Sequence, residues 1–122
     1  MSAVLDSTVL IDVLRIREKA VDFLLSLDTR PTCSEITRVE VLQGLRTQER
    51  GRADELFEQI HWVPLDEHLA RAAGEFGRRF RKSHHLDAAD LIVAATAKEL
   101  GLPLATSNVK HFPMFPRLKQ PY

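Results

Sequence analysis

Cysteine is nearly absent from the sequence, and this excludes two classes of protein. Cys33 is the single cysteine among the 122 residues, so no disulfide can form within the chain. It also lacks the cysteine and histidine partners that a zinc site needs at ligand spacing. We therefore expect Cys33 to be a small buried residue on a short strand.

Long hydrophobic runs are missing as well. No apolar stretch approaches the roughly 20 residues of a membrane-spanning helix. The apolar residues 3–5 follow the start directly, without the basic region and long apolar region of a signal peptide. From these absences we expect a cytoplasmic protein that does not bind a membrane.

The chain has no net charge, because 17 basic residues balance 17 acidic ones. This total argues neither for nor against a nucleic-acid partner, and the distribution of the charges matters more. If four acids converge in one pocket, 13 acids remain against 17 basic residues, which is an excess of four positive charges.

Length and composition are those of one ordinary globular domain, so we expect a single domain over residues 1–122.

Hydrophobic periodicity predicts short strands that alternate with helices. Strands are expected at residues 2–5, 32–34, 61–65 and 104–106. Helices are expected at residues 7–15, 18–27, 35–47, 48–60, 66–82 and 87–100, the last one ended by Gly101. In the third helix, Val39, Leu42 and Leu45 are expected to face inward. This order predicts an α/β fold with a mostly parallel sheet.

Several polar residues follow the predicted strands or begin the predicted helices. Asp6 ends the first strand and Asn108 follows the last one, while Glu40, Asp87 and Asp90 lie in the first turns of helices. Sites in open parallel sheets form outside the carboxyl ends of the strands. These residues could therefore share one edge of the sheet.

Each of these positions also has a purely structural interpretation. Asp6 could cap the first helix, and residues Thr37–Glu40 match a capping box. Asp87 and Asp90 stand three apart, as an N-cap and an N3 residue would, and Asn108 suits a turn. Capping and function need not exclude each other, because the positive end of a helix tolerates clustered carboxylates.

The residue types in this set favour one kind of chemistry. Carboxylates without histidine or cysteine at ligand spacing suit Mg²⁺ or Mn²⁺, which prefer oxygen ligands. Such an ion turns water into a better nucleophile and offsets charge on a phosphoryl oxygen, as phosphodiester hydrolysis requires. The five histidines have no nucleophile motif beside them, and the five glycines are scattered rather than gathered in a phosphate-binding loop.

Four segments resemble the motifs of PIN-domain ribonucleases, in family order and at family spacing. They are LDSTVLI at residues 5–11, TRVEVLQG at 37–44, LDAADLIVAATA at 86–97 and LATSNVKHF at 104–112. Each match is weak alone, but four in order across nearly the whole chain are specific. The length is similar to that of the VapC-type toxins of type II toxin–antitoxin systems.

This resemblance implies a PIN-like three-layer fold, with a central sheet of four to five mostly parallel strands and helices on both faces. It implies an endoribonuclease that uses Mg²⁺ or Mn²⁺ to hydrolyse RNA. It also implies two protein partners, namely a second copy in a homodimer and a cognate antitoxin that blocks the site.

The resemblance assigns roles to individual residues. Asp6, Glu40 and Asp90 match the family's metal-binding acids, and with Asn108 they form the expected catalytic set. Asn108 falls where many members carry aspartate, which removes one formal charge. Asp87 is an extra acid, either in the second shell of ligands or only a helix cap.

Further side chains are expected around these acids. Thr8 and Thr106 could hydrogen-bond the carboxylates. The basic candidates for RNA binding are Arg46, Arg78, Arg79, Arg81 and Lys82. The alternative for these cations is a solvated helix face. Trp62 could stack on a base, although a tryptophan on a strand more often packs in the core.

Two other functions remain open at this stage. The chain could be a catalytically inactive PIN-like module that binds RNA or a protein, an alternative that Asn108 motivates. A signalling domain phosphorylated on aspartate fits less well, because no lysine ends the strand after Thr106.

Overall fold

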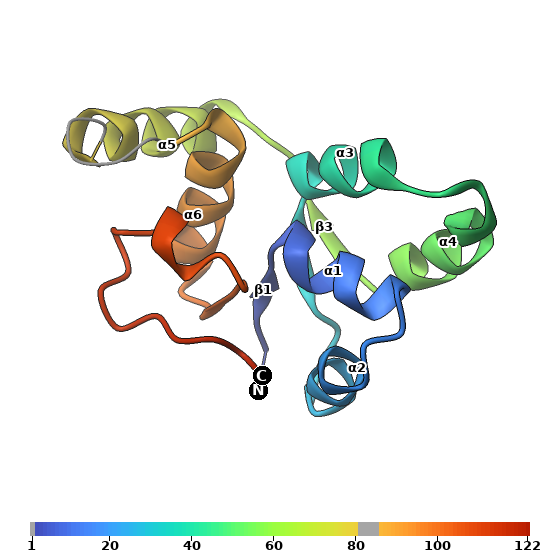
Figure 1. Cartoon of the computed structure of the whole chain (residues 1–122). Helices are drawn as coiled ribbons and strands as arrows, with labels where there is room; N and C mark the ends of the chain where they lie inside the picture. The colour runs from blue at the N-terminus through green and yellow to red at the C-terminus, as the bar shows by residue number, and fades with distance from the viewer. Residues whose placement is uncertain (1, 81–85) are drawn as a thin grey trace.

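The computed structural model describes residues 2–80 and 86–122 and contains one parallel sheet with the strand order β3-β2-β1-β4 (Figure 1). The strands are β1 (Val4–Leu5), β2 (Thr32–Ser34), β3 (His61–Val63) and β4 (Leu104–Ala105). All three neighbouring pairs are parallel. The predicted α/β fold with a mostly parallel sheet of four to five strands is confirmed.

All six predicted helices form, with ends that differ by a few residues. They are α1 (Ser7–Leu14), α2 (Glu18–Leu25), α3 (Glu35–Gly44), α4 (Arg50–Glu58), α5 (Glu67–Phe80) and α6 (Ala88–Leu100), joined by the short 3₁₀ helices η1 (Thr47–Glu49) and η2 (Val109–His111). Gly101 ends α6 in the left-handed region, with a φ of 65°, as predicted. Within residues 2–80 and 86–122, no helix has the length and apolarity needed to cross a bilayer.

Helices cover both faces of the sheet. Successive residues of β1 point to opposite faces, so each face packs against its own group of helices. Leu5 packs on one side with Leu10 of α1 and Leu56 of α4. Val4 packs on the other side with Phe76 of α5 and Val93 of α6. Figure 1 shows the two layers on either side of β1. Cys33 of β2 is fully buried, as expected.

The inward face of α3 differs from the prediction. Val39 and Leu42 are 55% and 49% exposed, whereas Thr37 and Val41 are fully buried. The two fully buried residues are four apart and form one stripe, while Leu45 at the end of the helix is partly buried against the core, as expected. The expectation that Val39 and Leu42 face inward is therefore wrong.

The capping box predicted at Thr37–Glu40 is also absent, because α3 begins earlier. Ser34 is the N-cap, and its hydroxyl accepts a hydrogen bond from the backbone N–H of Ile36 at 3.2 Å. Glu40 therefore lies in the second turn of α3, where its side chain is not needed for capping.

Candidate active site

The site lies where β1 and β4 end beside each other. Leu5 pairs with Ala105 in the sheet, so the next residues, Asp6 and Thr106, meet at the carboxyl edge. The backbone N–H of Asp6 continues the ladder by donating to Ala105 O at 2.9 Å. The sheet thus fixes the backbone on both sides of the Asp6 carboxylate.

The Asp6 carboxylate is buried and held by two threonines. Asp6 is 3% exposed, and its Oδ2 accepts hydrogen bonds from Thr106 Oγ1 at 2.7 Å and from Thr8 Oγ1 at 3.3 Å. Asp6 is the N-cap residue of α1, although its side chain makes no capping hydrogen bond to the helix. Burial raises the pKa of Asp6, and hydrogen bonds from Thr106, the Ser7 backbone and Thr8 partly oppose this rise.

Asp87 and Asp90 occupy the N-cap and N3 positions of α6, as predicted. Asp87 Oδ1 accepts a hydrogen bond from the Asp90 backbone N–H at 2.9 Å. Asp87 is exposed, whereas Asp90 is 8% exposed. Capping therefore engages the side chain of Asp87 and leaves the Asp90 carboxylate available.

Glu40 completes the group of acids. It is half-buried, and burial raises its pKa, with smaller upward contributions from the charges of Asp6 and Asp87 and an opposing hydrogen bond from Ser7. Burial raises the pKa of Asp90 to about 7, with further upward contributions from Asp87, Asp6 and Glu40. The structure thus gathers Asp6, Glu40, Asp87 and Asp90 into one cluster of mutually repelling carboxylates, called the acid cluster below.

His111 belongs to the surroundings of the acid cluster, and sequence analysis missed it. Its Nδ1 lies 3.2 Å from Asp90 Oδ2, and its charge opposes the rise in the pKa of Asp90. The strand-end rule that singled out Asn108 also covers His111, because both belong to the segment that follows β4. The contact itself spans 21 residues of sequence, and no local pattern reveals it.

Asn108 lies at the rim of the acid cluster. Its backbone N–H donates to Thr106 Oγ1 at 3.0 Å, which ties the turn after β4 to the threonine that holds Asp6. Its side chain is exposed and lines a cavity next to the cluster. The structure therefore connects Asn108 to Asp6 through Thr106.

Three of the five basic residues predicted to bind RNA lie in the described part of the structure. Arg46 is exposed just before η1, and Arg78 and Arg79 are exposed near the end of α5. Arg78 pairs with Glu75 at 3.4 Å, and the Arg79 guanidinium lies 5.4 Å from the ring centre of Phe80. The candidates Arg81 and Lys82 lie outside the described residues.

Trp62 packs against protein groups. Its Nε1 donates to Phe57 O at 3.0 Å, and its ring meets the Phe57 ring edge-on. The Arg38 guanidinium lies 4.0 Å from the centre of the indole ring. The half-buried indole is thus a packing residue in this structure.

The donor chemistry of the acid cluster fits a hard divalent cation. In the described part of the chain, no three acidic, histidine or cysteine side chains form a ready-made metal-binding group. Mg²⁺ does not need one, because it binds through one or two carboxylates and keeps several waters. The raised pKa values of Asp6, Glu40 and Asp90 are the electrostatic cost that a cation would relieve.

Replacing Thr106 with valine is expected to lower the free energy of unfolding by about 1–3 kcal/mol, because the buried Asp6 carboxylate and the Asn108 N–H each lose a partner. The loss should be smaller at acid pH, where the Asp6 carboxyl is protonated. Urea denaturation at neutral and acid pH measures both effects, with Thr29→Val at an exposed position as the control. Unchanged stability of Thr106→Val at neutral pH would contradict this account of Asp6.

Comparison with known families gives a match over nearly the whole chain. The model of the PIN domain family matches residues 3–117. Ribonuclease VapC19 of Mycobacterium tuberculosis is 38% identical over 122 residues, covering 97% of this chain and 98% of the relative. Ribonuclease VapC10 of the same organism is 42% identical over 120 residues, covering 96% and 90%.

A solved structure shares the fold closely. It is described as a toxin-antitoxin complex from Klebsiella pneumoniae, and one of its chains superposes with a TM-score of 0.85 at 26% sequence identity. The superposition covers 98% of both chains. The similarity therefore includes all the strands and helices that build the acid cluster.

Proposed function

Because the chain belongs to the PIN domain family, we propose that it is a metal-dependent endoribonuclease that hydrolyses the phosphodiester bonds of RNA. The observation that carries this proposal is the convergence of Asp6, Glu40 and Asp90 at the carboxyl edge of the sheet. The two Mycobacterium tuberculosis relatives, both named as ribonucleases, support RNA as the substrate.

In this proposal, Asp6, Asp90 and Glu40 hold Mg²⁺ or Mn²⁺. When bound, such an ion makes its water a stronger nucleophile and offsets the charge of the phosphate. Thr106 and Thr8 fix the Asp6 carboxylate, so that its position does not depend on the substrate. Asp87 acts through the α6 N-terminus that positions Asp90.

We assign Glu40 as the general base that accepts the proton of the attacking water. It is half-buried, which leaves its carboxylate within reach of a water molecule at the site. The water oxygen bonds to phosphorus, its proton goes to the Glu40 carboxylate, and the bond to the 3′ oxygen breaks. The products are a 5′-phosphate and a 3′-hydroxyl that takes its proton from solvent.

We further propose that the chain is the toxin of a toxin–antitoxin pair and acts on RNA in the cytoplasm. The complex from Klebsiella pneumoniae supports an antitoxin partner. For the homodimer, the exposed Val39 and Leu42 of α3 are the candidate contacts. The apolar stripe of α5 is not such a candidate, because Leu69, Ala73 and Phe76 are buried in one cluster with residues of α6.

The test of the proposed function is cleavage of a total RNA pool by the purified chain with Mg²⁺, with Mn²⁺ and with a chelator. We expect discrete fragments with 5′-phosphates in the presence of either metal and none with the chelator. Sequencing the fragment ends identifies the target. Cleavage that continues in chelator would contradict the mechanism, and RNA binding without cleavage under any condition would favour the inactive module that Asn108 motivates.

A further inference from the structure

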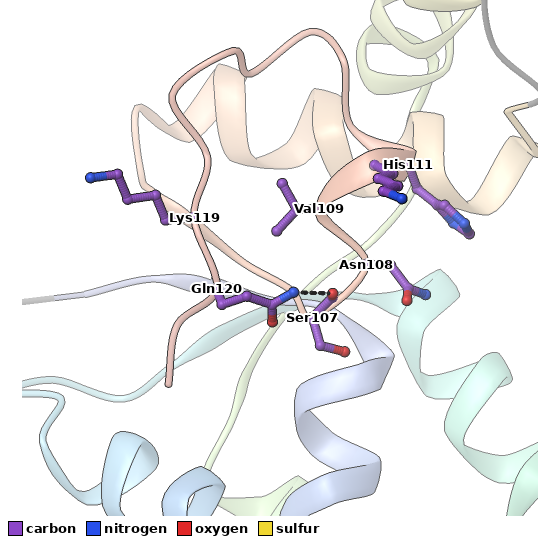
Figure 2. Close-up of a pocket in the computed structure, with 7 residues that line it drawn as sticks. Ser107, Asn108, Val109, His111, Lys119 and Gln120 are labelled. Atoms are coloured by element: carbon purple, nitrogen blue, oxygen red, sulfur yellow. Dashed lines mark hydrogen bonds between the residues drawn. The ribbon is translucent and has the colours of Figure 1, made fainter.

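A cavity of about 520 Å³ lies beside the acid cluster, between the segment after β4 and the C-terminal tail (Figure 2). Its volume falls within the roughly 300–1,000 Å³ that is usual for small-molecule sites. Asn108 and His111 line it, and His111 Nδ1 is 3.2 Å from Asp90 Oδ2. A ligand in this cavity would therefore lie next to the proposed point of cleavage.

Positively charged side chains line the cavity, whereas the neighbouring acid cluster is negatively charged. Lys110 and Lys119 line it, and no acidic residue does. Both lysines are exposed, and among the described residues neither ammonium group has a carboxylate within ion-pair distance. In Figure 2, Lys119 is on the tail, His111 is on the segment after β4, and the apolar side chain of Val109 lies between the two.

The wall formed by the tail is fastened to the rest of the molecule at two points. Gln120 Nε2 donates to Ser107 O at 2.7 Å, as the dashed line in Figure 2 marks. The Tyr122 hydroxyl donates to Asp12 of α1, and its ring packs against Phe23 of α2. These contacts fix the backbone of the tail on either side of Gln120 before any ligand binds, which reduces the ordering cost of binding.

We propose that this cavity, the lysine cavity, binds the RNA nucleotide next to the scissile phosphate. Lys110 and Lys119 contact the phosphates that flank this nucleotide, and Val109 offers an apolar surface to its sugar or base. The inference rests on the proposed ribonuclease function, because that function supplies the polyanionic substrate. In this arrangement the acid cluster acts on the scissile phosphate, and the lysine cavity holds the RNA strand beside it.

The experiment compares Lys110→Gln/Lys119→Gln with Arg15→Gln/Lys19→Gln. The control removes two exposed cations at the end of α1 and in α2, outside the cavity. Binding of a short fluorescent single-stranded RNA is measured by anisotropy in the Asp6→Asn background with Mg²⁺, over a range of salt concentrations. Cleavage of the same RNA is measured with each pair of substitutions in the otherwise unchanged chain.

We expect Lys110→Gln/Lys119→Gln to weaken RNA binding about tenfold and to reduce the slope of log K against log salt by about 1.4, which is about 0.7 for each lost phosphate contact. Its cleavage rate at low RNA concentration should fall by the same factor. The control should match the parent in both assays. Val109→Trp should also weaken binding, because it fills the cavity without changing charge.

Two other outcomes are distinct. If the parent cleaves RNA and the lysine variant binds and cleaves like the control, the lysine cavity is not the strand site, while the proposed function stands. If the parent does not cleave RNA under any condition, the proposed function fails. The anisotropy measurements then still decide whether RNA occupies the cavity.

Discussion

Replacing Asp6 with asparagine is expected to lower the rate of RNA cleavage by roughly 10²- to 10³-fold, the loss usual when one group that stabilises transition-state charge is removed. Asparagine has the same shape, so Thr106 and Thr8 can still donate to its side-chain oxygen. It lacks the negative charge that a divalent cation requires. The loss should therefore appear in catalysis and not in folding.

The fold should survive this change, because it removes a buried charge from a cluster of like charges. Burial already raises the pKa of Asp6, so the neutral asparagine relieves a cost of the folded state. Thermal unfolding followed by circular dichroism should give a melting temperature equal to or above that of the parent in chelator. Asp22→Asn on the exposed face of α2 is the matched control for cleavage. A variant at Asp6 that cleaves RNA at the parental rate would remove the basis for the proposed site.

The sheet and the helices could be predicted because their patterns are local. The run of buried residues from Val93 to Ala97 indicates a deep helix wherever it packs, and Gly101 ends that helix by its own backbone preference. The exposure of Val39 and Leu42 could not be predicted in this way. It depends on which face of α3 meets α1 and α6, and only the tertiary arrangement sets this.

The candidate site could be predicted in part for the same reason. Parallel strands end at one edge, so Asp6 and the segment after β4 had to be neighbours once β1 and β4 were paired. The hydrogen bonds from Thr8 and Thr106 to Asp6 agree with the expectation from the sequence. The pairing of His111 with Asp90 spans 21 residues and depends on side-chain geometry. Sequence spacing contains no information on the contact between His111 and Asp90.

The acid cluster also predicts an opposition between stability and function at Asp90. Because the folded state raises the pKa of Asp90 from 3.8 to about 7, the folded chain binds this proton more tightly than the unfolded chain does. In chelator, stability from this group is therefore greatest at acid pH, falls as pH rises through about 4 to 7, and stays low above that range. Asp90→Asn removes this loss, so it should raise the melting temperature at pH 8 by a few degrees and have little effect at pH 4.

At pH 8, Mg²⁺ should make the melting temperature of the parent higher than that of Asp90→Asn, which is the reverse of their order in chelator. A cation that binds only the folded parent stabilises it by mass action and offsets the repulsion among Asp90, Asp6 and Glu40. Asp90→Asn lacks one of these charges and should gain less from Mg²⁺, while its RNA cleavage falls by roughly 10²-fold or more. Thermal unfolding at pH 4 and pH 8, with chelator and with saturating Mg²⁺, measures each part, and Asp54→Asn on exposed α4 is the control. Equal gains in melting temperature from Mg²⁺ in the parent and in Asp90→Asn would show that Asp90 holds no cation. A parent that is equally stable at pH 4 and pH 8 in chelator would show that the Asp90 carboxylate has no electrostatic cost to relieve.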